Sequence, residues 1–236
     1  MSMHTPHSRW RWATTALTCL ALLACSAEPR DSWMVLQSGH TLVYDVSVAG
    51  DEPSTHTEWT LRTEGPREWN GQTVFTRWHS AGVRYFLVSD AQGVRRVAHQ
   101  TELDSEPVPD EPPVWVLKAP FVVGTEWSAP TVPHLLARRN EYPRELKHSH
   151  RATMVWRIES VSETLQIGDR TLAPCLKLVG TAQLNLYTDP VNGFTNVPLI
   201  SREWYCQGQG LVRLEREERV PQGFLLGGLL TAQWRP

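Results

Sequence analysis

The 236-residue sequence lacks the short motifs that mark common catalytic and cofactor-binding sites. It has no G-x-S-x-G nucleophile elbow, no phosphate-binding P-loop, no H-E-x-x-H zinc motif and no glycine-rich dinucleotide fingerprint. Serine, histidine and aspartate are plentiful, but no spacing among them defines a catalytic triad. We therefore expect a protein that is not an enzyme and that has no cofactor.

The sequence also lacks an apolar run long enough for a membrane-spanning helix. The charge-free run at residues 12–24 follows Arg9 and Arg11, and its length suits the helix of a signal peptide. It ends Leu22-Leu23-Ala24-Cys25, which resembles the lipobox of bacterial lipoproteins, where the cysteine after the cleavage site is acylated. The alternatives are an ordinary signal peptide with a chance cysteine and a buried apolar helix.

On the lipoprotein interpretation, residues 1–24 are the signal peptide, Cys25 is the lipidation site, residues 25–39 are a tether, and residues 40–236 form a single β domain. Several acyl chains on one cysteine would anchor the protein stably. In enterobacterial lipoproteins an aspartate after the cysteine is an inner-membrane retention signal. Ser26 occupies that position, which favours the outer membrane, facing the periplasm or the cell surface.

A strong charge of one sign is absent as well. Removing residues 1–24 takes away two arginines and no acid, which changes the formal net charge from −2 to −4. This mild, mixed charge has no basic patch and excludes nucleic acid as an expected partner. The expected partners are the membrane, reached through the N-terminal lipid anchor, and a lipid or another envelope protein.

Cysteine is scarce, and only Cys175 and Cys206 follow Cys25. An even pair in an oxidising envelope predicts a disulfide, with two buried free thiols as the alternative. If Asn192 and Gly193 formed a tight two-residue turn, Cys206 would lie opposite Val179, about 13 Å from Cys175 along the strand. The disulfide therefore requires a longer loop with another register, or bulges.

No helical period of useful length appears after Cys25. Apolar and polar residues alternate instead, with short turns between the runs. The pattern predicts an all-β or mainly β fold, a single antiparallel meander. The predicted strands lie at residues 42–48, 59–63, 74–79, 83–89, 94–99, 114–127, 153–166, 171–187 and 224–234, with a hairpin at 199–218.

Two long segments interrupt the predicted strands. Residues 101–113 are acidic and rich in proline, which removes the N–H donors of a sheet, so we expect a loop or linker there. Residues 128–150 hold three prolines and charged runs. They form either a mobile insertion or a loop with one short helical turn, and a loop of this length is often functional or disordered.

The hairpin at residues 199–218 has a four-residue turn, 207–210, whose two glycines can take positive φ. A register can be chosen because like charges should not face each other across the two strands. The register that satisfies this rule pairs Ser201 with Arg216, Arg202 with Glu215, Trp204 with Arg213, and Tyr205 with Val212.

This hairpin also carries a resemblance. Trp204-Tyr205, Gly208 and Gly210-Leu211-Val212-x-x-Glu215 resemble the W-Y-x-x-G-x-G-L-V-x-x-E hairpin of many bacterial secreted proteins and lipoproteins, which include the TapB-like group. With the similar upstream segments 118–127 and 171–179, the resemblance covers roughly residues 115–220. It implies a strongly curved antiparallel sheet, a half-barrel like that of the LolA and LppX lipoprotein carriers, and it implies no catalytic residue.

Tryptophan is in excess: nine of the eleven follow Cys25, and most of these lie in predicted strands. The simpler explanation is that they fill the core of a sheet. The alternative is that some line a concave face that is open to an apolar ligand such as an acyl chain. On that hypothesis Trp78, Trp115 and Trp156 are candidate ligand-binding residues, and loop 128–150 is a lid.

Histidines offer the only candidate metal ligands. His148 and His150 would project to one side of a strand, and His134 lies in the same loop. A solvated polar loop explains them as well, so we expect no metal site. Three hypotheses remain. An apolar cavity favours a lipid-binding lipoprotein, a filled core with an exposed apolar rim favours a structural or partner-binding one, and a tight histidine cluster favours a metal enzyme or hydrolase.

Overall fold

The computed structural model describes Met1 and residues 32–50, 54–139, 144–191, 193–220 and 224–236. The predicted signal peptide and lipidation site, Cys25, lie outside the described residues. In order along the described chain, the elements are β1 (Thr41–Gly50), β2 (Thr55–Trp69), β3 (Gln72–His79), β4 (Val83–Asp90), β5 (Gly93–Thr101), β6 (Val108–Lys118), β7 (Glu126–Thr131), β8 (Ala137–Arg138), the 3₁₀ helix η2 (Leu146–His148), β9 (Ala152–Ile167), β10 (Arg170–Asp189), β11 (Gly193–Cys206), β12 (Gly210–Glu218), β13 (Leu225–Leu226) and β14 (Gly228–Trp234).

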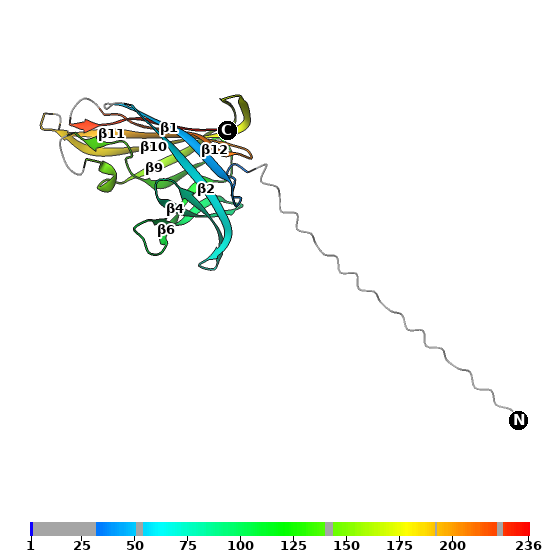
Figure 1. Cartoon of the computed structure of the whole chain (residues 1–236). Helices are drawn as coiled ribbons and strands as arrows, with labels where there is room; N and C mark the ends of the chain where they lie inside the picture. Colours follow the sequence, from blue (N-terminus) through cyan, green and yellow to red (C-terminus); the bar gives the residue numbers. More distant parts are fainter. Residues whose placement is uncertain (2–31, 51–53, 140–143, 192, 221–223) are drawn as a thin grey trace.

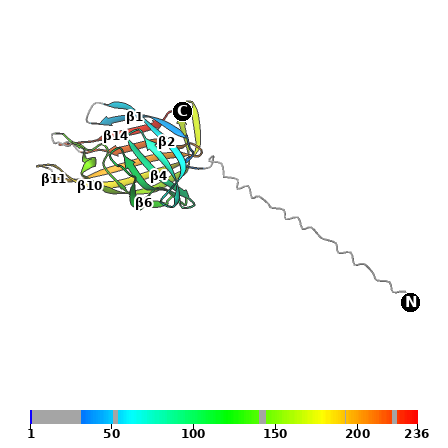
Figure 2. The ribbon, with the colours of Figure 1, turned by 60° about the horizontal axis from the view of Figure 1, so that its bottom comes forward.

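Twelve of these strands form one antiparallel sheet, in the order β6-β5-β4-β3-β2-β1-β14-β12-β11-β10-β9-β7. Strands β1 to β6 make one half of the sheet, and β7, β9 to β12 and β14 make the other. The two are joined where the first strand, β1, pairs with the last, β14. Figure 2 shows neighbouring strands of this sheet side by side along its curved wall. The predicted all-β antiparallel meander is confirmed.

The sheet curls until it is nearly closed into a barrel, further than the half-barrel expected from the sequence (Figure 1). Its two edge strands, β6 and β7, lie against each other. Strand β13 pairs with β8 in a separate two-stranded ribbon. Curling brings one face of every long strand toward a common interior, and that interior holds the site described below.

The predicted hairpin register is confirmed at three of its four pairs: Ser201 with Arg216, Arg202 with Glu215, and Trp204 with Arg213. The fourth is wrong, because Tyr205 lies opposite Leu211. The register shifts between Trp204 and Tyr205, which leaves Val212 as an extra residue on β12. The guanidinium of Arg213 covers the indole of Trp204, 5.3 Å from the ring centroid.

The predicted disulfide between Cys175 and Cys206 is present. The two residues lie directly opposite each other on β10 and β11. The hairpin that joins these strands pairs Tyr187 with Phe194, so its turn lies earlier in the chain than Asn192-Gly193. This register removes the offset that a tight turn at Asn192-Gly193 would have produced.

Part of the predicted loop 101–113 is strand. Residues from Val108 onward belong to β6, where Ala98 pairs with Pro109 and Arg96 with Val114. The prolines are tolerated because β6 is an edge strand of the sheet and can leave backbone groups unpaired on its open side. In loop 128–150, β7 takes the first residues, and the expected short helical turn is η2.

Residues 33–36, which the sequence analysis assigns to the tether, pack within the folded domain. Met34 and Val35 are buried, and Met34 lies in a cluster with Leu178 and Tyr205. The backbone of Ser32 accepts a hydrogen bond from Gly208 N at 3.0 Å. The folded domain therefore takes in these residues, only a few positions after the predicted lipidation site.

Candidate functional site

A cavity of about 290 Å³ lies on the inner side of the curved sheet. Apolar and aromatic side chains from both halves of the sheet make most of its wall, and Met34 of the N-terminal segment borders it. The lining residues are Met34, Tyr44, Trp59, Leu61, Arg77, His79, Tyr85, Leu87, Arg96, Val116, Glu203, Tyr205, Leu211, Leu214 and Ala232. An apolar cavity with a few polar groups is the usual form of a small-molecule site.

Glu203 and Tyr205 supply two of those polar groups, both from β11. They are two residues apart on one strand, so both side chains project to the same face of the sheet. The Tyr205 hydroxyl donates a 2.6 Å hydrogen bond to Glu203 Oε2. Burial raises the pKa of the Glu203 carboxyl, although the Tyr205 hydrogen bond and the charge of Arg216 act in the opposite direction. Burial and the neighbouring carboxyl raise the pKa of the Tyr205 phenol well above its ordinary value.

Arg77 supplies a buried cation to the same cavity. Its Nε and Nη2 both donate to Thr63 Oγ1, at 3.2 and 3.1 Å, and Nη2 also donates to the backbone oxygen of Val35 at 2.7 Å. These acceptors are uncharged. Burial lowers the pKa of Arg77, but a guanidinium keeps its proton in proteins. The described hydrogen-bond partners of Arg77 are therefore all neutral oxygen atoms, and one of them, the Val35 oxygen, comes from the N-terminal segment.

Tyr44, on β1, completes the polar group. Its hydroxyl donates a 2.7 Å hydrogen bond to the backbone oxygen of Leu211 across the cavity wall. Burial raises the pKa of this phenol above its ordinary range. The charges of both Arg77 and Glu203 act on Tyr44 and on Tyr205, so the two charged groups surround the same pair of phenols.

On the opposite wall, Arg96 is already paired. Its Nε and Nη2 bind the two carboxylate oxygens of Asp110 at 2.7 and 3.1 Å, and His99 Nδ1 lies 3.2 Å from the same carboxylate. Although Asp110 belongs to the acidic segment 101–113, its side chain is only 9% exposed. This pair joins β5 to the edge strand β6 and fixes the guanidinium beside the cavity.

The three candidate tryptophans do not border this cavity. Trp78 is 38% exposed on the outer face, because its neighbours Arg77 and His79 point inward and side chains alternate along a strand. Trp115 lies under the guanidinium of Arg95, 5.2 Å from the ring centroid. Trp156 stacks on Trp127, with centroids 6.4 Å apart. The tryptophan at the cavity is Trp59, whose ring meets His79 edge-on at 5.1 Å.

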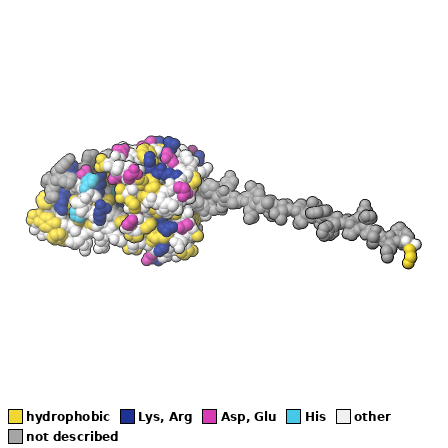
Figure 3. Space-filling model, turned by 90° about the horizontal axis from the view of Figure 1, so that it is seen from below, with side chains coloured by type: hydrophobic (Ala, Val, Ile, Leu, Met, Phe, Trp, Pro, Cys, Tyr) yellow, Lys and Arg dark blue, Asp and Glu magenta, His cyan; other side chains and the backbone are white. Residues whose placement is uncertain are grey.

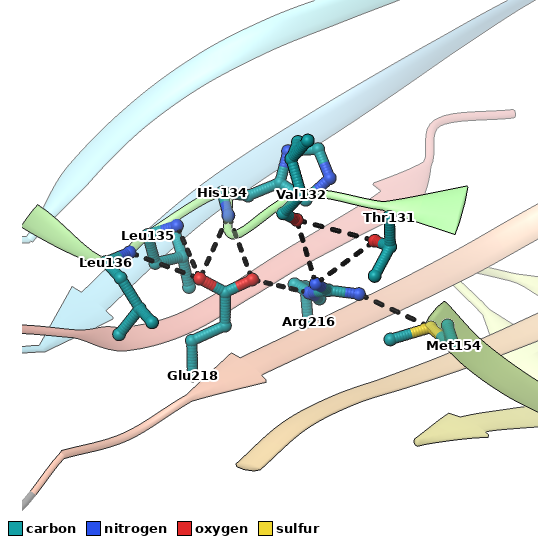
Figure 4. A network of polar contacts seen from close by, with 8 residues as sticks. All are labelled: Thr131, Val132, His134, Leu135, Leu136, Met154, Arg216 and Glu218. Atoms are coloured by element: carbon teal, nitrogen blue, oxygen red, sulfur yellow. Dashed lines mark hydrogen bonds and ion pairs between the residues drawn. The ribbon is translucent and has the colours of Figure 1, made fainter. Parts of the chain in front are cut away.

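A buried ion pair holds part of loop 128–150 onto the sheet (Figure 4). Glu218 accepts hydrogen bonds from the backbone N–H groups of His134, Leu135 and Leu136 at 2.8 to 3.2 Å. Arg216 binds Glu218 and also donates to the Val132 backbone oxygen at 3.1 Å. The predicted lid segment is thus fastened at residues 132–136 by two side chains of β12.

The histidines of this loop do not assemble a metal site. Within the described residues, no group of three or more histidine, cysteine, aspartate or glutamate side chains could hold an ion. Burial and the charge of Arg216 lower the pKa of His134, which packs beside the buried pair. His150 Nδ1 instead lies 2.8 Å from Ser149 Oγ. The described residues therefore bring no group of three such ligands together around these histidines.

Sequence reasoning did not identify Glu203 or Arg77, although one signal was available for Glu203. Glu203 lies two positions before Tyr205, and residues two positions apart on a strand share one face of the sheet. No sequence signal identified Arg77, because its partner Val35 lies in a segment interpreted as a tether. Among the described residues, no helix is long and apolar enough to span a membrane.

Comparison with known proteins adds little to this description. No family model matches the chain, and no curated protein matches it. A crystal structure from Parabacteroides distasonis, of a protein provisionally described as a lipoprotein, is 11% identical and has a TM-score of 0.40, covering 86% of this chain and 98% of that one. We draw no conclusion about function from a similarity of this size, and the resemblance to the TapB-like group stays a prediction.

Proposed function

We propose that this chain is a non-enzymatic, lipid-anchored protein of the bacterial cell envelope that holds a small, largely apolar molecule inside its curved sheet. The cavity is the observation that carries the proposal. Its space of about 290 Å³ is lined mostly by apolar and aromatic side chains with a few polar groups among them, which is the usual form of a small-molecule site. The lipobox-like sequence ending at Cys25 supplies the anchor, and Ser26 favours the outer membrane.

The size of the cavity limits the ligand. At about 30 Å³ per water molecule, the space corresponds to roughly ten non-hydrogen atoms. It lies at the small end of the range for ligand pockets, so it suits a compact molecule or the end of a longer chain rather than a whole phospholipid. Each Å² of apolar ligand surface that leaves water would contribute about 25 cal/mol to binding.

The proposal is tested with a substitution whose side chain fills the cavity. Ala232 is buried, borders the cavity and lies opposite Leu214, so Ala232→Phe should place a ring in the space. Val155→Phe, at an exposed position of β9, is the matched control. We expect native mass spectrometry of the mature domain, purified without denaturant, to find a bound molecule or to report uptake of an added apolar one. Ala232→Phe should abolish this binding, and Val155→Phe should not.

The proposal fails if the unaltered domain neither carries nor takes up any apolar molecule. It also fails if Ala232→Phe binds as well as the unaltered protein while remaining folded by circular dichroism. In the first case the structural or partner-binding hypothesis becomes the better one.

A second candidate function rests on the tip of the β10–β11 hairpin. Tyr187, Val191 and Phe194 are exposed there, with Phe194 68% exposed and its ring meeting Tyr187 edge-on. Hydrophobic side chains gather at the left end of the surface in Figure 3, the end that this hairpin reaches in Figure 1. An exposed apolar tip of this kind favours binding to an envelope partner. Phe194→Ser should then reduce crosslinking to that partner without changing the cavity.

A further inference from the structure

Two side chains that border the cavity, Glu203 and Arg77, each have a hydrogen-bonding atom that the described residues leave unused. Glu203 receives a hydrogen bond at Oε2 from Tyr205, and its Oε1 receives none. Arg77 donates through Nε and Nη2, and its Nη1 donates to no described residue. Both side chains border the cavity, so these two atoms are available to a molecule inside it.

The other charged groups nearby do not neutralise them. Arg216 is bound to Glu218, and Arg96 is bound to Asp110. Glu203 and Arg77 form no ion pair with each other or with any other described residue. A buried charge without an opposite charge is costly to a folded protein. Two such charges around the phenols of Tyr44 and Tyr205 mark the polar end of the site.

We propose, on the basis of the function proposed above, that the cavity selects an apolar molecule whose polar end is neutral overall and carries a donor next to an acceptor. The donor binds Glu203 Oε1 and the acceptor binds Arg77 Nη1. A carboxamide is the simplest such group, since its N–H₂ and C=O supply both partners. The apolar body lies against Trp59, Leu61 and Leu87.

The charges of the site exclude the simpler alternatives. A fatty acid anion would be attracted by Arg77, but its carboxylate would lie beside Glu203 and be repelled by the ionised form of that side chain. An alkyl ammonium would bring a second cation to Arg77. An alkane or a hydrocarbon ring would cover both charged groups and leave them without hydrogen bonds, which costs binding free energy. Only a head with both functions satisfies the two unused atoms.

The test compares ligands with one apolar body and different heads: octanamide, octanoate and octylamine. Binding to the mature domain is followed by calorimetry and by the fluorescence of the tryptophans at neutral pH. We expect octanamide to bind about tenfold or more tightly than either charged ligand, the ratio expected for hydrogen bonds to charged groups. Glu203→Leu, which replaces the acceptor with an apolar side chain of similar size, should remove this preference while the domain stays folded.

A conservative variant separates charge from shape. Glu203→Gln retains an acceptor oxygen but carries no charge, so octanoate should bind this variant more tightly than it binds the unaltered protein. Glu217→Gln, in which the altered carboxylate pairs with Arg202 and Arg219 away from the cavity, is the control and should change no affinity. Equal binding of all three ligands, or a preference for octanoate or octylamine in the unaltered protein, overturns this inference and leaves the proposed cavity function standing. Absence of binding by every ligand and of any co-purified molecule overturns both.

Discussion

Arg216 Nε donates a 2.6 Å hydrogen bond to Glu218 Oε1, and the two side chains are 5% and 0% exposed. They lie two residues apart on β12 and face the interior. The carboxylate satisfies three consecutive backbone N–H groups of the chain at His134 to Leu136 as well. A buried pair is stabilising only when its remaining hydrogen bonds are made, and here the loop makes them.

Glu218→Gln should therefore be strongly destabilising. The amide has a similar shape, but its N–H₂ group would face donors rather than acceptors, and Arg216 would lose its counter-charge. Breaking a buried pair from one side costs about 3–5 kcal/mol of the free energy of unfolding. Urea denaturation of the two proteins measures this loss. The same loss should be visible as faster proteolysis of the chain near residues 132–136.

Removing both charges provides the control. In a double-mutant cycle, Arg216→Met with Glu218→Leu should cost less than the sum of the two single changes, since neither charge is left unpaired. Additive single effects would contradict the account of Glu218 as a partner of Arg216.

The disulfide should contribute a separate share of stability. Cys175 and Cys206 are 31 residues apart, and closing a loop of that length stabilises a protein by about 3.5 kcal/mol in the chain-entropy model. Cys175→Ala with Cys206→Ala should lower the free energy of unfolding by roughly this amount, as should a reducing agent acting on the unaltered protein. Mass spectrometry without reduction that found two free thiols in the mature domain would refute the bond.

Lipidation at Cys25 is a prediction from sequence alone, because this residue lies outside the described part of the chain. Cys25→Ser should release the protein from the membrane fraction or leave it unprocessed, since a lipoprotein signal peptide is cleaved before the acylated cysteine. Labelling with a radioactive or clickable fatty acid should mark the unaltered protein only. A processed Cys25→Ser variant that stayed with the membranes would contradict the prediction.

Local sequence patterns predicted the individual strands better than their assembly. Alternation identified β1, and the charge pairs around Gly208 identified most of the β11–β12 register. The pairing of β1 with β14 joins residues at opposite ends of the domain, and no local pattern encodes it. The prolines of β6 were misinterpreted because their compatibility with a strand depends on its being an edge, which only the assembled sheet reveals.

The site was predictable only in part for the same reason. Alternation along β11 places Glu203 beside Tyr205, but the meaning of that placement depends on Arg77 from the other half of the sheet and on Met34 from the N-terminal segment. Tryptophan content indicated an aromatic interior, and Trp59 does border the cavity. Side chains alternate between the two faces of a strand, so the position of a tryptophan in this alternation decides whether it points inward. In β3, Arg77 points inward and its neighbour Trp78 therefore points outward.

The raised pKa of Glu203 predicts how stability depends on pH. Because burial favours the protonated carboxyl in the folded protein, the contribution of Glu203 to stability is complete below its unfolded pKa, near the ordinary value of 4.5, and is lost as pH rises through the folded pKa. Glu203→Gln has no proton to lose. The unaltered protein should therefore lose stability relative to this variant as pH rises from about 4 toward neutrality. The free energy of unfolding of the variant minus that of the unaltered protein should increase over this range. Burial lowers the pKa values of His40, His79 and His134, but both proteins share these groups, so their effect cancels in the difference.

A second variant changes the pKa of Glu203 itself. Tyr205→Phe removes the hydroxyl whose hydrogen bond lowers the pKa of Glu203, so the loss of stability should extend to higher pH in this variant. A difference between Glu203→Gln and the unaltered protein that stays constant from pH 4 to 8 would show that Glu203 ionises in the folded protein as it does in the unfolded chain.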